Sequence, residues 1–339
     1  MLTLLDAFCG AGGLSLGFEM RGWETTLAFD HVPIAVDTFN KNHSGNALVL
    51  DASATTGRDL LRLSGLEPGA CDLLAGGPPC QGFSLQRRGA REDIRNELVL
   101  RYLDWIAVVQ PRAFLMENVH AIRSIRGSHL LEEVCAFAER SGYSTYVETL
   151  DAVDYGLPQT RRRAFVVGVP RGSNFEWPTP QNIRRTVRDA IGDLPSPPED
   201  GSPHPFVPNH YREARLSAIN RERIRVVPEG GGREDLPPHL QLECHKNGHR
   251  HLDTYGRMSW NAPAPTITAR FDSFTRGRFG HPEEDRSVTL REGARLQGFP
   301  DSFVFLGNRE EGARMIGNAV PPPLAARIAE SITLALTRH

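Results

Sequence analysis

The stretch Leu2-Thr-Leu-Leu-Asp-Ala-Phe-Cys-Gly-Ala-Gly-Gly-Leu14 decides the fold class, because it reads as an apolar strand, a glycine-rich turn and the start of a helix. We expect the strand over 2–6 and the helix from about Leu14 to Arg21. Glycines between a strand and a helix let a ligand approach the main chain. The turn lacks the G-x-G-x-x-G spacing of dinucleotide sites and suits a nucleoside better than a pyrophosphate. Taken alone, it is equally compatible with a plain tight turn.

The same alternation of strands and helices continues to about residue 170. Further strands are expected at 25–29, 47–50, 71–75, 113–116 and 164–168, and helices at 34–42, 96–109 and 128–141. Alternating strands and helices predict an α/β fold with a parallel sheet covered by helices on both faces. Asp30 ends the second expected strand, where its carboxylate is placed to hold ribose hydroxyls.

The chain changes character after about residue 171. Proline and glycine become frequent and apolar periodicity is weak, which predicts a smaller, loop-rich second domain over 172–284. Helical pattern resumes at 290–296 and 323–336. We therefore expect a first domain over 1–171, a second domain over 172–284, and a return to the first domain over 285–339.

Composition narrows the class of protein. The chain has 339 residues, which is more than a single hydrophobic core usually stabilises. Five cysteines without regular spacing favour a reducing compartment over a disulfide scaffold. Neither a long apolar run nor a signal peptide is found, so we expect a cytoplasmic protein without a membrane partner. The net charge is −4 over residues 1–183 but +3 over 184–280. The 37 arginines suit phosphate and guanine binding, or reflect a codon bias.

Two motifs follow expected strands directly, where active sites lie in parallel sheets. In Gly76-Gly-Pro-Pro-Cys-Gln-Gly-Phe-Ser84, two prolines stiffen the approach to Cys80, a candidate nucleophile. The alternative is a buried structural cysteine. In Met116-Glu-Asn-Val119, Glu117 is a candidate proton donor if burial raises its pKa. The alternative for Glu117 is a structural ion pair.

A third motif, Gln159-Thr-Arg-Arg-Arg-Ala-Phe165, supplies cations. In a strand, alternate residues share a face, so Arg161 and Arg163 are expected to point the same way. The alternative is an exposed basic patch. No metal site is expected, because the spacing of Cys244, His245, His249 and His251 matches no zinc pattern.

These motifs in this order resemble the cytosine-C5 DNA methyltransferase family of the bacterial or phage restriction-modification type. The resemblance continues through residues 291–303 and 317–324, which are similar to the family's last two motifs. It implies a seven-stranded, Rossmann-like S-adenosylmethionine-dependent methyltransferase sheet with the last strand antiparallel. It also implies a C-terminal helix beside the first strand and a small target-recognition domain.

The resemblance implies a role for each matching residue. Cys80 would be the nucleophile, Glu117 the acid that binds the base, and Arg161 and Arg163 the contacts to base and phosphate. Asp30 would bind the ribose of S-adenosylmethionine and Asp51 its adenine amino group. The rest of the cofactor pocket would be formed by Phe8, Gly10, Gly12, Gly13, Pro79, Leu98, Asn318 and Val320.

The implied activity is methyl transfer from S-adenosylmethionine to C5 of a cytosine flipped out of a specific double-stranded DNA sequence, through a covalent bond between Cys80 and C6. A loop over 81–95 carries Arg87, Arg88, Arg91 and Arg95 and is expected to contact phosphates. Base contacts are expected within 250–257 and 266–278. The expected enzyme is a monomer, and a cognate restriction endonuclease would act separately from it.

Three other readings remain open at this level. A branch of the same family methylates cytosine in tRNA, but its Cys-Phe-Thr signature is not found in this sequence. A nicotinamide-dependent oxidoreductase on the same sheet would leave Pro-Pro-Cys-Gln unexplained. A non-catalytic DNA-binding regulator is disfavoured by the presence of Cys80, Glu117 and Arg163 together.

Overall fold

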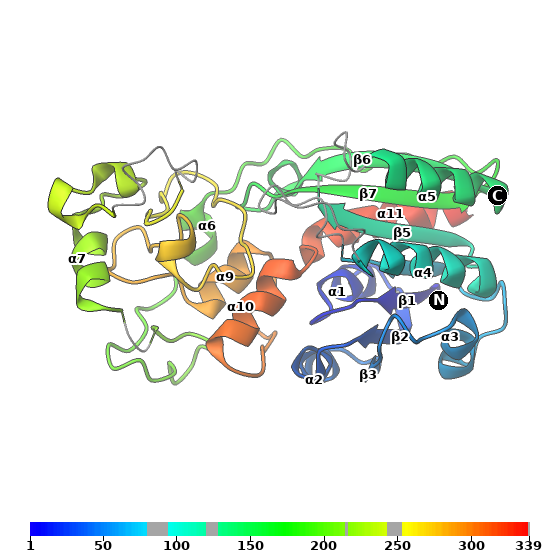
Figure 1. Ribbon diagram of the computed structural model, residues 1–339, viewed down its shortest axis with the longest axis horizontal. Helices are drawn as coiled ribbons and strands as arrows, with labels where there is room; N and C mark the ends of the chain where they lie inside the picture. The colour runs from blue at the N-terminus through cyan, green and yellow to red at the C-terminus, as the bar shows by residue number, and fades with distance from the viewer. Residues whose placement is uncertain (80–93, 120–127, 214–215, 243–252, 338–339) are drawn as a thin grey trace. The chain divides into compact units, whose positions relative to one another are not determined.

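The computed structural model describes residues 1–79, 94–119, 128–213, 216–242 and 253–337 (Figure 1). The chain forms two compact units, and each is built from separate segments of the sequence. Unit 1 comprises residues 1–151, 162–180 and 320–339, and unit 2 comprises residues 152–161 and 181–319.

Unit 1 is built on a seven-stranded sheet with the order β3-β2-β1-β4-β5-β7-β6. The strands are β1 (Thr3–Ala7), β2 (Glu24–Asp30), β3 (Ala47–Val49), β4 (Leu73–Gly76), β5 (Ala113–Val119), β6 (Tyr143–Asp151) and β7 (Arg162–Pro170). β7 runs antiparallel to both neighbours, β5 and β6, whereas the pairs from β3 to β5 are parallel. The expected sheet, with its last strand antiparallel, is therefore confirmed.

The helices of unit 1 are α1 (Gly13–Glu19), α2 (Pro33–Asn42), α3 (Gly57–Ser64), α4 (Ile94–Val109), α5 (Ser128–Arg140) and α11 (Pro322–Thr337). α4 packs against α3 and α5, while α11 packs on α1, the helix that follows β1. Gly17 permits this close packing, because a Cβ there would lie 2.4 Å from the Pro322 carbonyl oxygen. The C-terminal helix thus returns to the side of the first strand, as expected.

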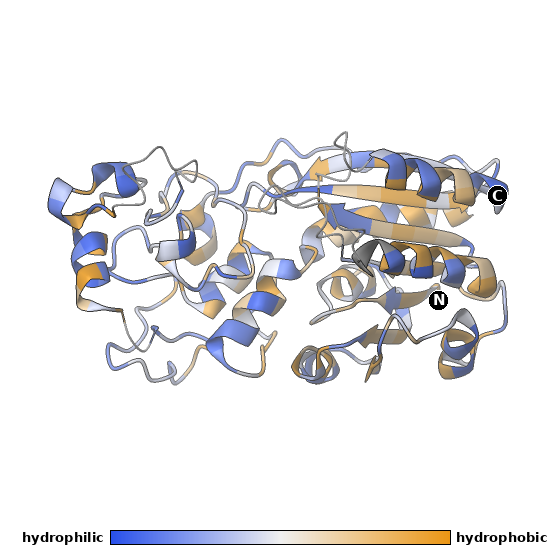
Figure 2. Cartoon of the chain, viewed as in Figure 1, coloured by the Kyte–Doolittle hydropathy of each residue, from blue (hydrophilic) through white to orange (hydrophobic). Residues whose placement is uncertain are grey.

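Apolar runs explain why the central strands form. Residues 113–116 of β5 are fully buried, as expected of a strand with helices over both faces. Figure 2 shows β5 and β7 hydrophobic over most of their length and hydrophilic at one end. The hydrophilic ends carry Glu117 and Asn118 on β5 and Arg162 and Arg163 on β7. Polar side chains are therefore concentrated where these two strands meet at one edge.

Unit 2 contains the short helices α6 (Val187–Ile191), α7 (Ala218–Val226), α9 (Leu290–Leu296) and α10 (Arg309–Asn318). Single 3₁₀ turns lie at Ala152–Tyr155, Arg233–Asp235, Pro238–Leu240 and Phe274–Arg276. β-structure among its described residues is limited to isolated bridges such as Gln159↔Ala264. The expected loop-rich character is seen, and buried ion pairs supplement a modest apolar core. Arg286 and Glu292, for example, are 2% and 1% exposed and form two hydrogen bonds of 2.8 Å.

The two units divide the chain differently from the expected boundaries at 172 and 285. Residues 285–319 group with unit 2, because α9 packs on α6 and α10 packs on α9. The short segment 152–161 also joins unit 2. One strand and four helices were not expected from the sequence: β6, α3, α6, α7 and α10. The other strands and helices named above lie close to their expected positions.

Candidate active site

The glycine-rich turn after β1 forms an open loop in unit 1. Phe8, Gly10 and Gly12 all have positive φ, at 59°, 54° and 91°. A Cβ at Gly10 would meet no atom within 4 Å, so a ligand can approach the main chain there. The Cys9 amide donates to the Phe29 carbonyl at 3.0 Å, which ties the loop to the end of β2.

Two carboxylates lie at the ends of neighbouring strands. Asp30 ends β2 and accepts hydrogen bonds from the Gly10 amide at 3.0 Å and the Val32 amide at 2.9 Å. Asp51 follows β3 and accepts from the amide and hydroxyl of Ser53, and these hydrogen bonds lower the pKa of Asp51. Each oxygen of Asp30 accepts one of these bonds and Asp51 Oδ2 accepts none of them, so both carboxylates can accept a further hydrogen bond.

His31 was not predicted as a site residue. Its side chain is 77% exposed, and its Nδ1 lies 3.2 Å from Asp30 Oδ1. Its electrostatic attraction also contributes to the lowered pKa of Asp51, which places it near both carboxylates. In the sequence, the signal for His31 was an aromatic side chain directly after Asp30, the residue that ends β2.

Apolar side chains complete this part of unit 1. The Phe8 ring lies 6.3 Å from the Phe29 ring and 5.7 Å from the Trp105 ring. Leu98 on α4 packs against the same core cluster as Phe8. Val320 is nearly buried, and Pro79 is half-buried. An apolar wall, an open main-chain turn and two carboxylates are the groups that a nucleoside such as that of S-adenosylmethionine requires, so these residues fit that cofactor.

Glu117 and Arg163 form an ion pair on adjacent antiparallel strands. Glu117 pairs in register with Phe165, so Arg163 is its diagonal neighbour on the same face. Arg163 Nε lies 3.2 Å from Glu117 Oε1, and the two side chains are 18% and 14% exposed. The predicted alternative of an ion pair for Glu117 is thus observed, with the predicted cation as its partner.

The segment before Cys80 approaches this ion pair. The Asn118 side chain donates to the Pro78 carbonyl at 3.1 Å, and Asn118 is buried. A Cβ at Gly77 would lie 3.1 Å from Glu117 Oε2, so the Gly-Gly-Pro-Pro segment runs directly beside the carboxylate. Cys80 itself lies outside the described residues, as does the expected arginine loop from residue 81 to 93.

Arg161 differs from Arg163 in position and contacts. β7 begins at Arg162, so Arg161 precedes the strand and belongs to unit 2. It is 1% exposed, and its guanidinium donates to the carbonyls of Ile267, Gly317 and Ala319 at 2.9–3.0 Å. The expectation that the two arginines share a strand face is therefore wrong. The contacts that Arg161 makes within unit 2 brace the main chain, and its contact with base or phosphate stays a prediction.

Asn318 also belongs to unit 2, where it is the exposed last residue of α10. Within the expected base-reading segments, Arg257 is 4% exposed and donates to carbonyls of residues 224, 227, 281 and 284, which gives it a structural role. Four residues whose spacing matches no zinc pattern lie outside the described residues: Cys244, His245, His249 and His251. Among the residues that are described, no cluster suited to a metal is found.

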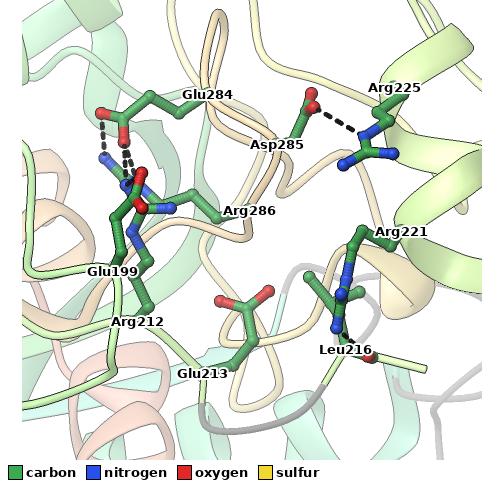
Figure 3. A pocket seen from close by; sticks show the side chains of 9 residues that line it. All are labelled: Glu199, Arg212, Glu213, Leu216, Arg221, Arg225, Glu284, Asp285 and Arg286. Carbon is green, nitrogen blue, oxygen red and sulfur yellow. Dashed lines mark hydrogen bonds and ion pairs between the residues drawn. The ribbon is translucent and has the colours of Figure 1, made fainter. Parts of the chain in front are cut away.

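Unit 2 also holds a cavity of about 560 Å³ (Figure 3). It is lined by Glu199, Arg212, Glu213, Leu216, Arg221, Arg225, Glu284, Asp285 and Arg286. Ion pairs join several of them, such as Arg212 to Glu284 at 3.2 Å and Arg225 to Asp285 at 3.4 Å. Because its four acidic groups balance its four arginines, this cavity is not a basic phosphate-binding surface.

Comparison with known proteins decides the family. The family model described as C-5 cytosine-specific DNA methylase matches residues 2–334.

The chain belongs to this methylase family.

Type II methyltransferase M.AgeI of Thalassovita gelatinovora is 32% identical over 99% of this chain and 100% of its own length. Type II methylase M.HgiDII of Herpetosiphon aurantiacus is 34% identical over 97% of this chain and 94% of its own length. The methylase therefore carries out cytosine-5 methylation of DNA, as type II modification methyltransferases do.

Solved structures agree on the fold. A prophage-encoded protein from E. coli, named as a DNA modification methyltransferase, superimposes with a TM-score of 0.77 at 25% identity over the whole of both chains. S. pombe Dnmt2 superimposes with a TM-score of 0.66 at 20% identity, over 99% of this chain and all of its own, which shows a shared fold. No helix among the described residues of the methylase is long and apolar enough to cross a membrane.

Proposed function

We propose that this methylase uses S-adenosylmethionine to methylate C5 of a cytosine that is flipped out of a specific sequence in double-stranded DNA, with Cys80 as the covalent nucleophile. The observation that carries the proposal is the Glu117–Arg163 pair beside the Gly77–Pro78 segment. This arrangement supports the interpretation that three motifs belong to one catalytic site: Pro-Pro-Cys-Gln, Glu-Asn-Val and Gln-x-Arg-x-Arg.

The chemistry follows from the reactivity of cytosine. C5 is a poor nucleophile, and addition of the Cys80 thiolate to C6 makes C5 electron-rich. Glu117 would hydrogen-bond or protonate N3, which favours that addition, and Arg163 would hold O2, where negative charge also accumulates. Because Arg163 stays close to Glu117, the same guanidinium also orients the carboxylate toward the base. After methyl transfer, loss of the C5 proton and departure of the Cys80 sulfur restore the aromatic ring.

S-adenosylmethionine supplies an electrophilic methyl group on a sulfonium. Phe8, Gly10, Gly12 and Gly13 would contact it along the open loop, with Asp30 at the ribose and Asp51 at the adenine amino group. Pro79, Leu98, Asn318 and Val320 would complete the pocket. Asp51 accepts from Ser53 through Oδ1, so its Oδ2 would be the acceptor for the amino group.

Unit 2 would recognise the DNA sequence, because it contains the whole of the basic segment 184–280. The type II relatives place the methylase in a restriction-modification context, in which a separate endonuclease would cut the unmethylated sequence. We further propose that the enzyme acts as a monomer in the cytoplasm.

The decisive experiment is incorporation of tritiated methyl groups from S-adenosylmethionine into DNA and, in parallel, into tRNA. We expect label in double-stranded DNA at one sequence, located by bisulfite sequencing. Label in tRNA alone would overturn the proposed substrate. Retained activity in Cys80→Ser would overturn the proposed nucleophile.

A further inference from the structure

A buried histidine lies directly behind the glycine turn of unit 1. His43 follows α2, and its side chain is fully buried. Its Nδ1 lies 2.8 Å from Glu19 Oε2 on α1, and its Nε2 lies 3.3 Å from the Ala11 carbonyl oxygen in the turn. Both ring nitrogens therefore face oxygen acceptors. The imidazole therefore links α1 to the loop through both of its ring nitrogens.

The ring also fixes the shape of the turn by its position. Gly12 has a φ of +91°, and a Cβ there would lie 2.2 Å from His43 Nε2. The imidazole stacks on Phe39, one helical turn earlier, with 4.0 Å between ring centroids and 17° between planes. His43 therefore occupies the space that a side chain at position 12 would need. It cannot move without disturbing the stacked Phe39.

Glu19 is itself held in place. The Thr25 hydroxyl donates to Glu19 Oε1 at 2.8 Å, while Glu19 Oε2 faces His43. A continuous polar chain thus runs from β2 through α1 to the ring and on to the Ala11 carbonyl. On the other side, Asp30 accepts from the Gly10 amide. Two adjacent loop residues are therefore held at separate points by groups outside the loop.

We propose that His43, oriented by Glu19, is a positioning residue that presets the Phe8–Gly13 loop for the cofactor. The inference rests on the proposed function, because it assumes that this loop binds S-adenosylmethionine. A loop fixed before binding loses less conformational freedom when the ligand arrives, which strengthens binding. The polar contacts carry the effect, since an apolar ring of similar size would fill the space but remove the contacts of His43 with Glu19 Oε2 and the Ala11 carbonyl.

The test compares two substitutions at His43 in the full-length protein. His43→Phe keeps an aromatic ring but removes both ring nitrogens, whereas His43→Gln retains one side-chain donor group. Glu19→Gln removes the orienting charge without touching the loop. His129→Phe makes the same chemical change at an exposed position on α5 and is the matched control.

Binding of S-adenosylhomocysteine is measured by calorimetry, and DNA binding is measured separately without cofactor. We expect roughly tenfold weaker S-adenosylhomocysteine binding in His43→Phe and in Glu19→Gln, the scale of one hydrogen bond to a charged group. His43→Gln should recover part of the loss, and the double variant should lose less than the sum of the two. DNA affinity and kcat at saturating S-adenosylmethionine should stay within about twofold, with the loss confined to the KM for S-adenosylmethionine.

Unchanged cofactor binding in folded His43→Phe, or in Glu19→Gln if His43→Phe does not fold, would overturn the inference. Equal losses in cofactor and DNA binding would also overturn it, because they would indicate general destabilisation. If the wild-type protein itself does not bind S-adenosylhomocysteine, the proposed function fails, and that result is distinguishable from failure of the inference alone.

Discussion

The carboxyl group of Asp6 in β1 offers a quantitative test of how burial couples charge to stability. Asp6 is 2% exposed, and the Ser15 hydroxyl donates to its Oδ2 at 2.6 Å. Burial raises the pKa of Asp6 from 3.8 to about 7, in spite of the opposing effects of the Ser15 hydrogen bond and of His43. We predict that Asp6→Asn removes a large part of the pH dependence of folding.

The direction of this pH dependence follows from the number of protons that Asp6 binds in the native and unfolded states. Between pH 4 and pH 7 the native carboxyl group keeps its proton while the unfolded chain has lost it, so the free energy of unfolding falls as pH rises. Above pH 7 both states are ionised at Asp6, and this dependence ends. A shift of about three pKa units corresponds to roughly 4 kcal/mol over the whole window. From pH 5 to pH 8 the expected loss is about 3 kcal/mol.

Urea unfolding followed by tryptophan fluorescence measures this loss. Trp23 and Trp105 are buried in unit 1 and report on its unfolding. The wild-type protein should lose about 3 kcal/mol more than Asp6→Asn between pH 5 and pH 8, because asparagine cannot titrate. Asp37→Asn, which removes an exposed carboxyl on α2, should follow the wild type. Parallel curves for wild type and Asp6→Asn would refute the reasoning, as would an Asn variant less stable than wild type at pH 8.

Three further predictions concern the site. DNA containing 5-fluorocytosine at the target should form a covalent adduct with the enzyme only when S-adenosylmethionine is present, because fluorine cannot leave C5 as a cation. Mass spectrometry should map the adduct to Cys80, and an adduct formed by Cys80→Ser would contradict the assignment of Cys80 as the nucleophile. Glu117→Gln should lower kcat by about 10²–10⁴-fold with S-adenosylhomocysteine affinity unchanged, and an unaltered kcat in single-turnover assays would exclude Glu117 from the chemistry. Arg161→Met should destabilise unit 2 by at least about 2 kcal/mol, because buried carbonyls lose a charged donor, and Trp260 fluorescence should report this loss. Unchanged stability together with a weaker salt dependence of DNA binding would instead indicate that Arg161 contacts a phosphate.

Much of the fold was predictable because local patterns and global packing agree. The buried apolar runs of β4, β5 and β7 are continuous, and continuous runs indicate strands covered on both faces. β6 escaped prediction because it lies at the edge of the sheet, where most of its residues are only half-buried and no strong apolar run is needed. The helices α3 and α10 were missed although both begin with a capping box, at Thr56 and Asn308, which was a readable signal.

The sequence by itself determined the order of the motifs, the family they resemble and the residue types available for chemistry. The tertiary structure decided which of those residues share a site. Arg161 and Arg163 are two positions apart, yet one is buried among the carbonyls of unit 2 and the other pairs with Glu117 in unit 1. His43 gave no signal, because its importance depends on Glu19 and Ala11, which reach it only when α1 and α2 pack beside the loop. Burial and pairing arise from contacts between distant parts of the chain, and local spacing carries no information about them.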